Sequence, residues 1–167
     1  MKYGIVLSSK TGNTAILAEK IKETLTAYEC SYFGGIDKAP SHMDIIFVGF
    51  WTDKGTCDEG IMNYLQQLEN KKIFLFGTAG FGGEASYFEQ ILKRVEKNIS
   101  KTNTIIGTFM CQGKMPIGIR KRYEIILQQN PEDKKMIQMI DNFDKALAHP
   151  NDSDLSHLCR KILEALK

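Results

Sequence analysis

Four short apolar runs constrain the fold of this 167-residue chain more than any other feature. They lie at residues 3–7, 45–50, 72–76 and 104–110, and each is nearly continuous in Ile, Val, Leu and Phe. Such runs are typical of parallel strands that are covered on both faces, whereas half-exposed strands alternate apolar and polar residues. A weaker run at residues 28–33 precedes two glycines and is a candidate edge strand.

The stretches between these runs have their apolar residues at the spacing of a helix. Apolar residues recur every three or four positions from Leu17, from Ile61 and from Phe88 onward. Right-handed crossovers over such an alternation produce an open parallel sheet with helices on both faces. The sequence therefore predicts an α/β fold.

The last third of the chain is helical throughout. Apolar residues keep helical spacing after Pro116, and Pro131 and Pro150 divide the stretch into two or three segments. This part is short and no linker precedes it, so it does not suggest a second domain. We predict one domain over residues 1–167, in which residues 117–167 form a helical extension packed on the sheet.

Charge and composition argue against several function classes. The chain has 22 Lys+Arg and 20 Asp+Glu, a formal charge of +2, and no dense basic run, so nucleic acid is not an expected partner. It has no signal sequence and no run of eighteen apolar residues, so we expect no membrane association and a cytoplasmic location. Its four cysteines are widely spaced and lack nearby histidines, which predicts reduced thiols and no metal site.

Ligands of open parallel sheets bind at the carboxyl ends of the strands, so the segments that follow the strands are the candidate sites. The first is SSKTGNT, residues 8–14, between the first strand and the first helix. Free amides and the dipole at a helix N-terminus attract phosphate, Ser9, Thr11 and Thr14 add hydroxyls, and Gly12 permits close approach. The triphosphate and dinucleotide glycine motifs are absent, which favours a phosphate monoester. A turn that only caps the helix is the alternative.

The pattern S-K-T-G-N-T, which directly follows a first strand that starts at residue 3, resembles the phosphate loop of the flavodoxin family. The resemblance extends over roughly residues 1–115. It implies a flavodoxin-like three-layer sandwich with a five-stranded parallel sheet in the order 2-1-3-4-5, one noncovalently bound FMN, and single-electron transfer. The cofactor-binding residues that it implies in this loop are Ser9, Lys10, Thr11, Gly12, Asn13 and Thr14, with Lys10 acting through its backbone amide.

The second segment, residues 50–59, contains the only tryptophan, Trp51. An indole stacks well on a flat heterocycle, for which the isoalloxazine of FMN is the candidate, although Trp51 could also be core filler. In flavodoxins the corresponding loop carries a peptide beside the flavin N5 that turns over upon reduction. The resemblance assigns that role to Gly55, which is free to adopt positive φ. The implied cofactor-binding residues are Trp51, Thr52, Lys54 and Gly55.

The third segment, residues 77–83, is rich in glycine and opens the next helix. Glycines let backbone groups approach the edge of a planar ligand, and flavodoxins hydrogen-bond the pyrimidine part of the flavin in this way. Phe81 could be a second stacking aromatic residue or could gate access. The implied cofactor-binding residues are Thr78, Ala79, Gly80, Phe81, Gly82 and Gly83.

A fourth segment, residues 110–116, ends the last strand and is a possible neighbour of the ribityl chain or of a partner. Its Cys111 invites a nucleophile hypothesis, but the C-x5-R phosphatase loop requires arginine at position 117, where the chain has Ile117. We therefore expect Cys111 and Cys57 to be ordinary thiols and predict no catalytic residue.

The charge near the expected site differs from that of typical flavodoxins, which are strongly acidic. The pI of this chain is about 8.3, and Lys10, Lys54 and Lys114 dilute the acidic residues of the expected site. A lysine within several Å of the ring stabilises negative charge on it. We expect the fully reduced flavin to form more easily than in acidic flavodoxins.

The leading interpretation is an FMN electron carrier, a monomer or weak dimer, that exchanges electrons with a partner reductase or acceptor enzyme. One alternative is an FMN-dependent oxidoreductase of the quinone or porphyrinogen type, in which the C-terminal helices shape a substrate pocket. Another is a flavin-free receiver module of the same topology. It is disfavoured because Ser8, Ser9 and Lys10 replace the receiver's acidic cluster.

Overall fold

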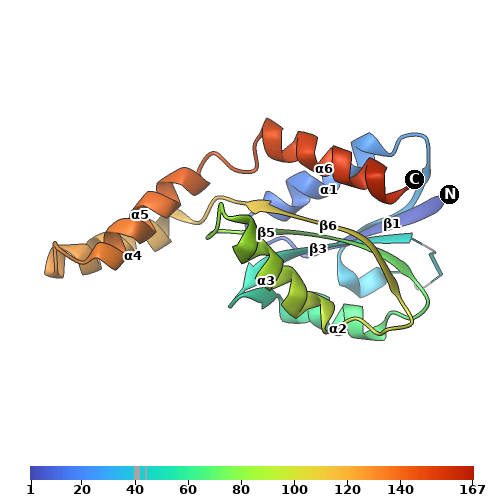
Figure 1. Cartoon of the computed structure of the whole chain (residues 1–167), viewed down its shortest axis with the longest axis horizontal. Coiled ribbons are helices and arrows are strands. Elements are labelled where there is room, and N and C mark those ends of the chain that lie inside the picture. Colours follow the sequence, from blue (N-terminus) through green and yellow to red (C-terminus); the bar gives the residue numbers. More distant parts are fainter. Residues whose placement is uncertain (40–41, 44) are drawn as a thin grey trace.

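A parallel sheet forms the middle layer of the computed structural model, which describes residues 1–39, 42–43 and 45–167 (Figure 1). Its long strands are β1 (Lys2–Leu7), β2 (Glu29–Gly34), β3 (Ile45–Asp53), β5 (Lys72–Ala79) and β6 (Thr104–Gln112). They lie in the order β2-β1-β3-β5-β6, and all neighbouring pairs are parallel. The predicted order 2-1-3-4-5 is confirmed, because β5 and β6 are the fourth and fifth long strands. The short β4 (Thr56–Cys57) pairs antiparallel with the end of β3.

Three strands run further toward their carboxyl ends than the apolar runs predict. β3 continues to Asp53 and β5 to Ala79, and Trp51 pairs with Thr78 across them. β6 continues to Gln112, which pairs with Ala79. Backbone hydrogen bonding carries the ladder past the point where the side chains cease to be apolar. The second and third predicted loops therefore begin inside strands.

Successive side chains of the strands enter two separate cores. On one face Ile46, Val48 and Phe50 of β3 pack with apolar residues of α2 (Glu59–Gln67) and α3 (Ala85–Glu96). On the other, Phe47 packs with residues of α1 (Asn13–Thr24) and α6 (Asp152–Ala165). Two helices thus cover each face (Figure 1). Burial on both faces explains why the strands are continuous apolar runs.

The C-terminal third is divided between the body and a projection. α6 packs on α1 and β6, and its Leu158 and Ile162 are fully buried. α4 (Ile117–Gln129) and α5 (Lys134–Ala146) pack on each other and project beyond the carboxyl ends of the strands (Figure 1). α4 has no buried residue. The predicted extension at residues 117–167 therefore divides into a helix that packs on the sheet and a hairpin that does not.

None of the helices in the described ranges has the length and apolarity that crossing a membrane requires. A short 3-10 helix (Ile36–Lys38) follows β2, and both chain termini lie at the end of the molecule opposite the hairpin (Figure 1).

Replacing Phe47 with alanine should destabilise the protein by about 3–5 kcal/mol, because the cavity left in a packed core adds to the lost burial of the ring. Phe47 is fully buried, and its ring centroid lies 5.6 Å from that of Tyr3 and 5.4 Å from that of Phe74. The free energy of unfolding, measured in urea, tests this. Ile125→Ala is the control, because Ile125 is 57% exposed on the hairpin and its loss should change stability little.

Candidate functional site

A cavity of about 260 Å³ opens at the carboxyl ends of β1, β3 and β5. Its walls come from four segments that are far apart in the sequence: the loop after β1, the ends of β3 and β5 with the loop after β5, and the stretch from the end of β6 into α4. This is the edge at which open parallel sheets bind ligands.

Nine of the sixteen predicted cofactor-binding residues line this cavity. They are Lys10, Thr11, Asn13, Trp51, Thr52, Thr78, Ala79, Gly80 and Phe81. The structure adds lining residues that the predicted set lacks, namely Gly113, Lys114, Met115, Pro116 and Ile119. The first four of these belong to the segment that the sequence indicated as a neighbour of the site. Ile119 belongs to α4, one of the C-terminal helices that the oxidoreductase alternative places at the site, but no residue of that helix was among the predicted ones.

The loop after β1 leaves the start of α1 open. Gly12 precedes the helix with φ +89°, a left-handed conformation that L side chains rarely adopt. The first amides of a helix have no intrahelical acceptor, so those of Asn13 and Thr14 remain free to bind an anion. The Ser9 hydroxyl accepts a hydrogen bond from the amide of Ala15 at 3.3 Å. The Ser9 hydroxyl thus satisfies one amide of the first turn of α1, although the N-cap position itself is Gly12, which has no side chain.

Thr14 is a buried residue at the start of α1 that hydrogen-bonds to the ends of β3 and β5. It is 1% exposed, its hydroxyl donates to the Phe50 carbonyl at 3.2 Å, and it shares a hydrogen bond of 3.1 Å with the Thr78 hydroxyl. The Thr52 hydroxyl donates to the Thr78 carbonyl at 2.9 Å. These bonds hold the start of α1 against the ends of β3 and β5. Thr14 therefore does not line the cavity, but it holds together the elements that form the cavity walls.

Asn13 carries an unused acceptor at the cavity wall. Its side-chain amide donates to the Thr11 hydroxyl at 3.0 Å and to the Lys114 carbonyl at 2.9 Å. Its Oδ1 is buried and has no hydrogen-bond partner in the described part of the chain. A buried polar atom left without a partner costs about 1–3 kcal/mol. The site is therefore suited to a ligand that brings a hydroxyl or N–H donor to Asn13.

Aromatic and cationic side chains form the outer part of the cavity. Trp51 and Phe81 line it, and the Lys10 ammonium lies 4.7 Å from the centroid of the Trp51 ring, within cation–π range. Lys10 and Lys114 are its charged lining residues, and no carboxylate from the described residues accompanies them. This wall suits a ligand that is both aromatic and anionic.

Lys54 and Gly55 lie away from the cavity. They are the two central residues of the tight turn between β3 and β4, and their φ angles of +48° and +81° are those of a type I′ turn. Arg94 of α3 donates to the Gly55 carbonyl at 3.0 Å. The structure thus places these two predicted residues at the tip of a hairpin. Gly82 and Gly83 also lie outside the lining, in the turn toward α3.

Met115 packs directly on the loop after β5. A Cβ added to Gly80 would come within 2.5 Å of the Met115 Cγ and Sδ atoms. A side chain at position 80 would therefore require Met115 to move, and the segment after β6 closes one side of the cavity against the loop after β5.

Two cysteines near the site are buried. Burial, the largest effect, raises the pKa of Cys57 to about 11, while a hydrogen bond from Thr56 lowers it and the charge of Asp58 raises it. Burial, followed by the charge of Asp154, raises the pKa of Cys111 further. Both thiols stay protonated at neutral pH, so neither is a ready nucleophile. Among the residues that the structure describes, no cluster of His, Cys, Asp or Glu could hold a metal ion.

Comparisons with known proteins agree with this geometry. The family model of the flavodoxin domain matches residues 4–163. The flavodoxin-like domain-containing protein BilS of Clostridium symbiosum is 39% identical over 173 residues, covering 93% of this chain and 91% of that protein. The protein of the same name from Clostridioides difficile is 33% identical over 159 residues and covers 93% of this chain and 90% of its own length.

Among solved structures, a short-chain flavodoxin associated with a non-canonical PDU bacterial microcompartment superposes with a TM-score of 0.52. Its sequence identity is 16%, and the match covers 99% of this chain and 97% of that one. At this identity the match concerns the fold alone.

Iodoacetamide at pH 8 should leave Cys57 and Cys111 unmodified in the native protein, because burial and a raised pKa both suppress the reactive thiolate. Cys30 and Cys159 are half-exposed and should react more quickly. Mass spectrometry of peptides after alkylation, with a urea-unfolded sample as the control in which all four react, measures this. Rapid native labelling of Cys111 would reopen the nucleophile hypothesis.

Proposed function

Because the chain belongs to the flavodoxin family, we propose that it binds one FMN in the cavity and carries electrons between partner oxidoreductases. The observation that supports this best is that one cavity joins an open helix N-terminus to a tryptophan wall. A phosphate and an aromatic ring therefore have complementary surfaces within one site.

The cavity residues fit the parts of FMN in order. Thr11 and the first amides of α1 would hold the phosphate, and the Asn13 Oδ1, which lacks a donor, would accept a hydrogen bond from a ribityl hydroxyl. Trp51 and Phe81 would flank the ring system. When bound, FMN supplies reversible electron uptake and release.

In this function the chain binds the FMN, excludes water from the flavin ring and sets the reduction potential of the flavin. The rings of Trp51 and Phe81, together with Met115, exclude water from the cavity wall. Lys10 and Lys114 favour electron uptake by their positive charge. No side chain needs to move a proton in the carrier role, which is consistent with the protonated state of Cys57 and Cys111.

One observation favours a second function, an FMN-dependent oxidoreductase that acts on a small substrate of the quinone or porphyrinogen type. Met115, Pro116 and Ile119 add an apolar wall beside the cavity that could receive such a substrate. Steady-state turnover of a quinone with NAD(P)H, without an added reductase, would favour this enzyme over the carrier.

FMN binding is the direct test of the proposal. Gly12→Asp should abolish binding, because it strains a backbone with φ +89° and adds a negative charge beside the phosphate. Thr11→Ala should weaken it by roughly 10–100-fold, the loss expected for one hydrogen bond to a charged group. Quenching of flavin fluorescence gives the affinities, with the exposed Thr26→Ala as the control. Unchanged affinity in both site variants would refute the site.

The lysine that tunes the flavin should be Lys10, because Lys10 lines the cavity and Lys54 does not. Lys10→Ala should lower the potential for reduction of the bound flavin by on the order of 40 mV, equivalent to about 1 kcal/mol of lost charge attraction. Lys54→Ala, which removes the same charge from the turn tip, should have a smaller effect. Potentiometric titration compares the two, and equal potentials in all three proteins would contradict the tuning role.

A further inference from the structure

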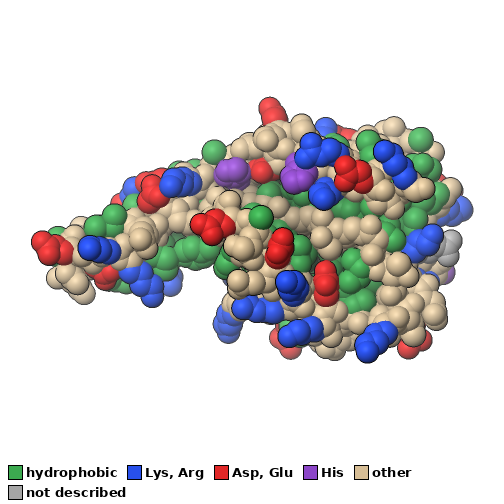
Figure 2. Space-filling model, in the orientation of Figure 1, with side chains coloured by type: hydrophobic (Ala, Val, Ile, Leu, Met, Phe, Trp, Pro, Cys, Tyr) green, Lys and Arg blue, Asp and Glu red, His purple; other side chains and the backbone are tan. Residues whose placement is uncertain are grey.

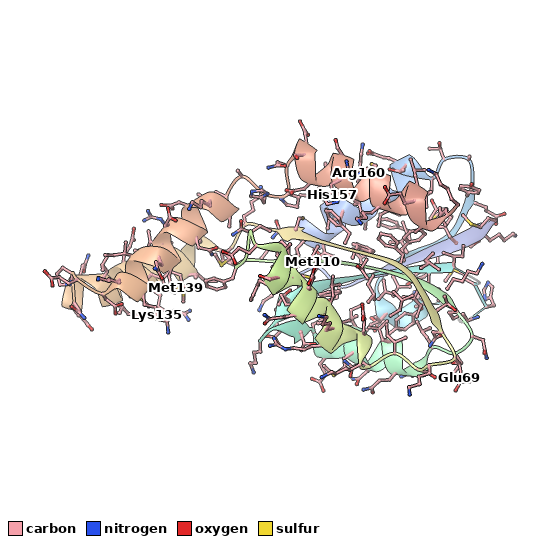
Figure 3. All side chains as sticks on the ribbon, in the orientation of Figure 1. Glu69, Met110, Lys135, Met139, His157 and Arg160 are labelled. Carbon is pink, nitrogen blue, oxygen red and sulfur yellow. The ribbon has the colours of Figure 1, made fainter. Side chains whose placement is uncertain are left out.

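The α4–α5 hairpin stands directly beside the cavity. Pro116 and Ile119 line the cavity, while the rest of the hairpin projects past the carboxyl ends of the strands (Figure 1). A protein that approached the cavity mouth would therefore meet the hairpin as well. Lys135 and Met139 mark the projecting part of α5 (Figure 3).

The hairpin exposes an unusual amount of apolar surface. Half of the large apolar side chains that are exposed among the described residues belong to residues 117–147. They are Ile117, Ile125, Ile126, Ile137 and Leu147. Apolar side chains gather along the edge of the hairpin where it joins the body (Figure 2). Concentrated apolar exposure of this kind marks an interaction surface.

Positive charge lies in the cavity lining and on the adjoining first turns of α4. Lys10 and Lys114 line the cavity, and Lys121 and Arg122 are exposed within three residues of Ile119. Arg120 is neutralised by Asp144 and Glu124, but Lys114, Lys121 and Arg122 form no salt bridge with any described carboxylate. A partner surface that is negatively charged would complement this region.

The base of the hairpin is fastened to the cavity wall. The Asn142 side chain donates to the Gly80 carbonyl at 3.0 Å, and the Gln112 side chain donates to the same carbonyl at 3.1 Å and to the Asn142 Oδ1 at 3.0 Å. The backbone amide of Lys114 donates to the His149 carbonyl at 3.2 Å. The hairpin is thus held in place before any partner binds, which lowers the entropic cost of docking.

We propose that the α4–α5 hairpin and the cationic cavity mouth together form the docking surface for a redox protein that presents acidic residues around an apolar centre. The proposal rests on the electron-carrier function proposed above. In each exchange one electron leaves one protein's redox centre and enters the other's, and no further reactant is required.

The charged residues of the docking surface argue against two other binding partners, a second copy of this chain and a membrane. A second copy of this chain would bring one cationic mouth against another, which is unfavourable. An anionic membrane would require basic residues along the whole hairpin, as in amphipathic membrane-surface helices. The hairpin instead intersperses its six basic residues with five acidic ones, Glu124, Glu132, Asp133, Asp141 and Asp144.

Stopped-flow oxidation of the FMN-loaded, dithionite-reduced protein tests the surface, with acidic cytochrome b5 and basic cytochrome c as probes. At low salt the reaction with cytochrome b5 should be the faster, and it should slow by about tenfold or more as salt screens the attraction. The double variant Lys121→Glu/Arg122→Glu should lose about tenfold in rate with cytochrome b5 and gain rate with cytochrome c.

The matched control is Lys97→Glu/Lys101→Glu. It changes the net charge by the same amount at exposed positions near the start of β6, away from the cavity, and should keep the wild-type rates within about twofold. A second variant, Ile117→Ser/Ile125→Ser, should also slow the reaction with cytochrome b5, because it removes apolar contact without changing charge.

The outcomes separate this inference from the function on which it rests. Failure of the protein to take up FMN would refute both. Normal FMN binding with rates that are independent of salt, or equal in the two charge variants, would overturn the docking surface alone. Sedimentation of a dimer that Ile117→Ser/Ile125→Ser dissociates, or binding to anionic phospholipid vesicles that Lys121→Glu/Arg122→Glu abolishes, would assign the surface to a second copy or to a membrane instead.

Discussion

Parallel pairing of β1, β3 and β5 is the constraint on which the rest of the structure depends. Because the strands point the same way, their carboxyl ends meet at one edge, and the register brings Leu7 beside Gly49 and Trp51 beside Thr78. The free amides at the start of α1 and the Trp51 ring then belong to one cavity. Thr14 reinforces this arrangement, since its buried hydroxyl joins α1 to the ends of β3 and β5. A slip in register would separate the start of α1 from the Trp51 ring.

The element that this chain adds to a minimal α/β sandwich lies at the same edge of the sheet, where the strands have their carboxyl ends. The chain inserts a helical hairpin between β6 and α6, and Asn142 and Gln112 tie it to the Gly80 carbonyl at the cavity wall. Events at the hairpin and at the cavity therefore share a hydrogen-bonded network. Lys114, Lys121 and Arg122 of this region form no salt bridge with any carboxylate of the described residues. Cavity and hairpin lie at the same end of the molecule.

Much of the fold and part of the site could be predicted from residues alone. Near-continuous apolar runs at residues 45–50 and 72–76 indicate strands buried on both faces, because each alternate side chain has its own core to enter. The turn at residues 8–14 and Trp51 were correctly placed at one sheet edge, since parallel topology brings all carboxyl ends together. Lys54 and Gly55 lie outside the cavity lining, because the pairing of Asp53 with Thr56 makes them a tight turn whose Gly55 carbonyl accepts a hydrogen bond from Arg94.

The sequence by itself determined the α/β layering and the turn that joins the first strand to the first helix, because periodicity and turn chemistry are local properties of the chain. Only the tertiary structure decided which polar groups are already satisfied. The Ser9 hydroxyl accepts a hydrogen bond from the Ala15 amide and Thr14 faces inward, while the Asn13 Oδ1 has no partner among the described residues. It also decided that α4 and α5 leave the sheet and α6 returns to it. α5 and α6 have similar apolar periodicities, and what separates them is the element that receives the apolar face, which is α4 for α5 and α1 with β6 for α6.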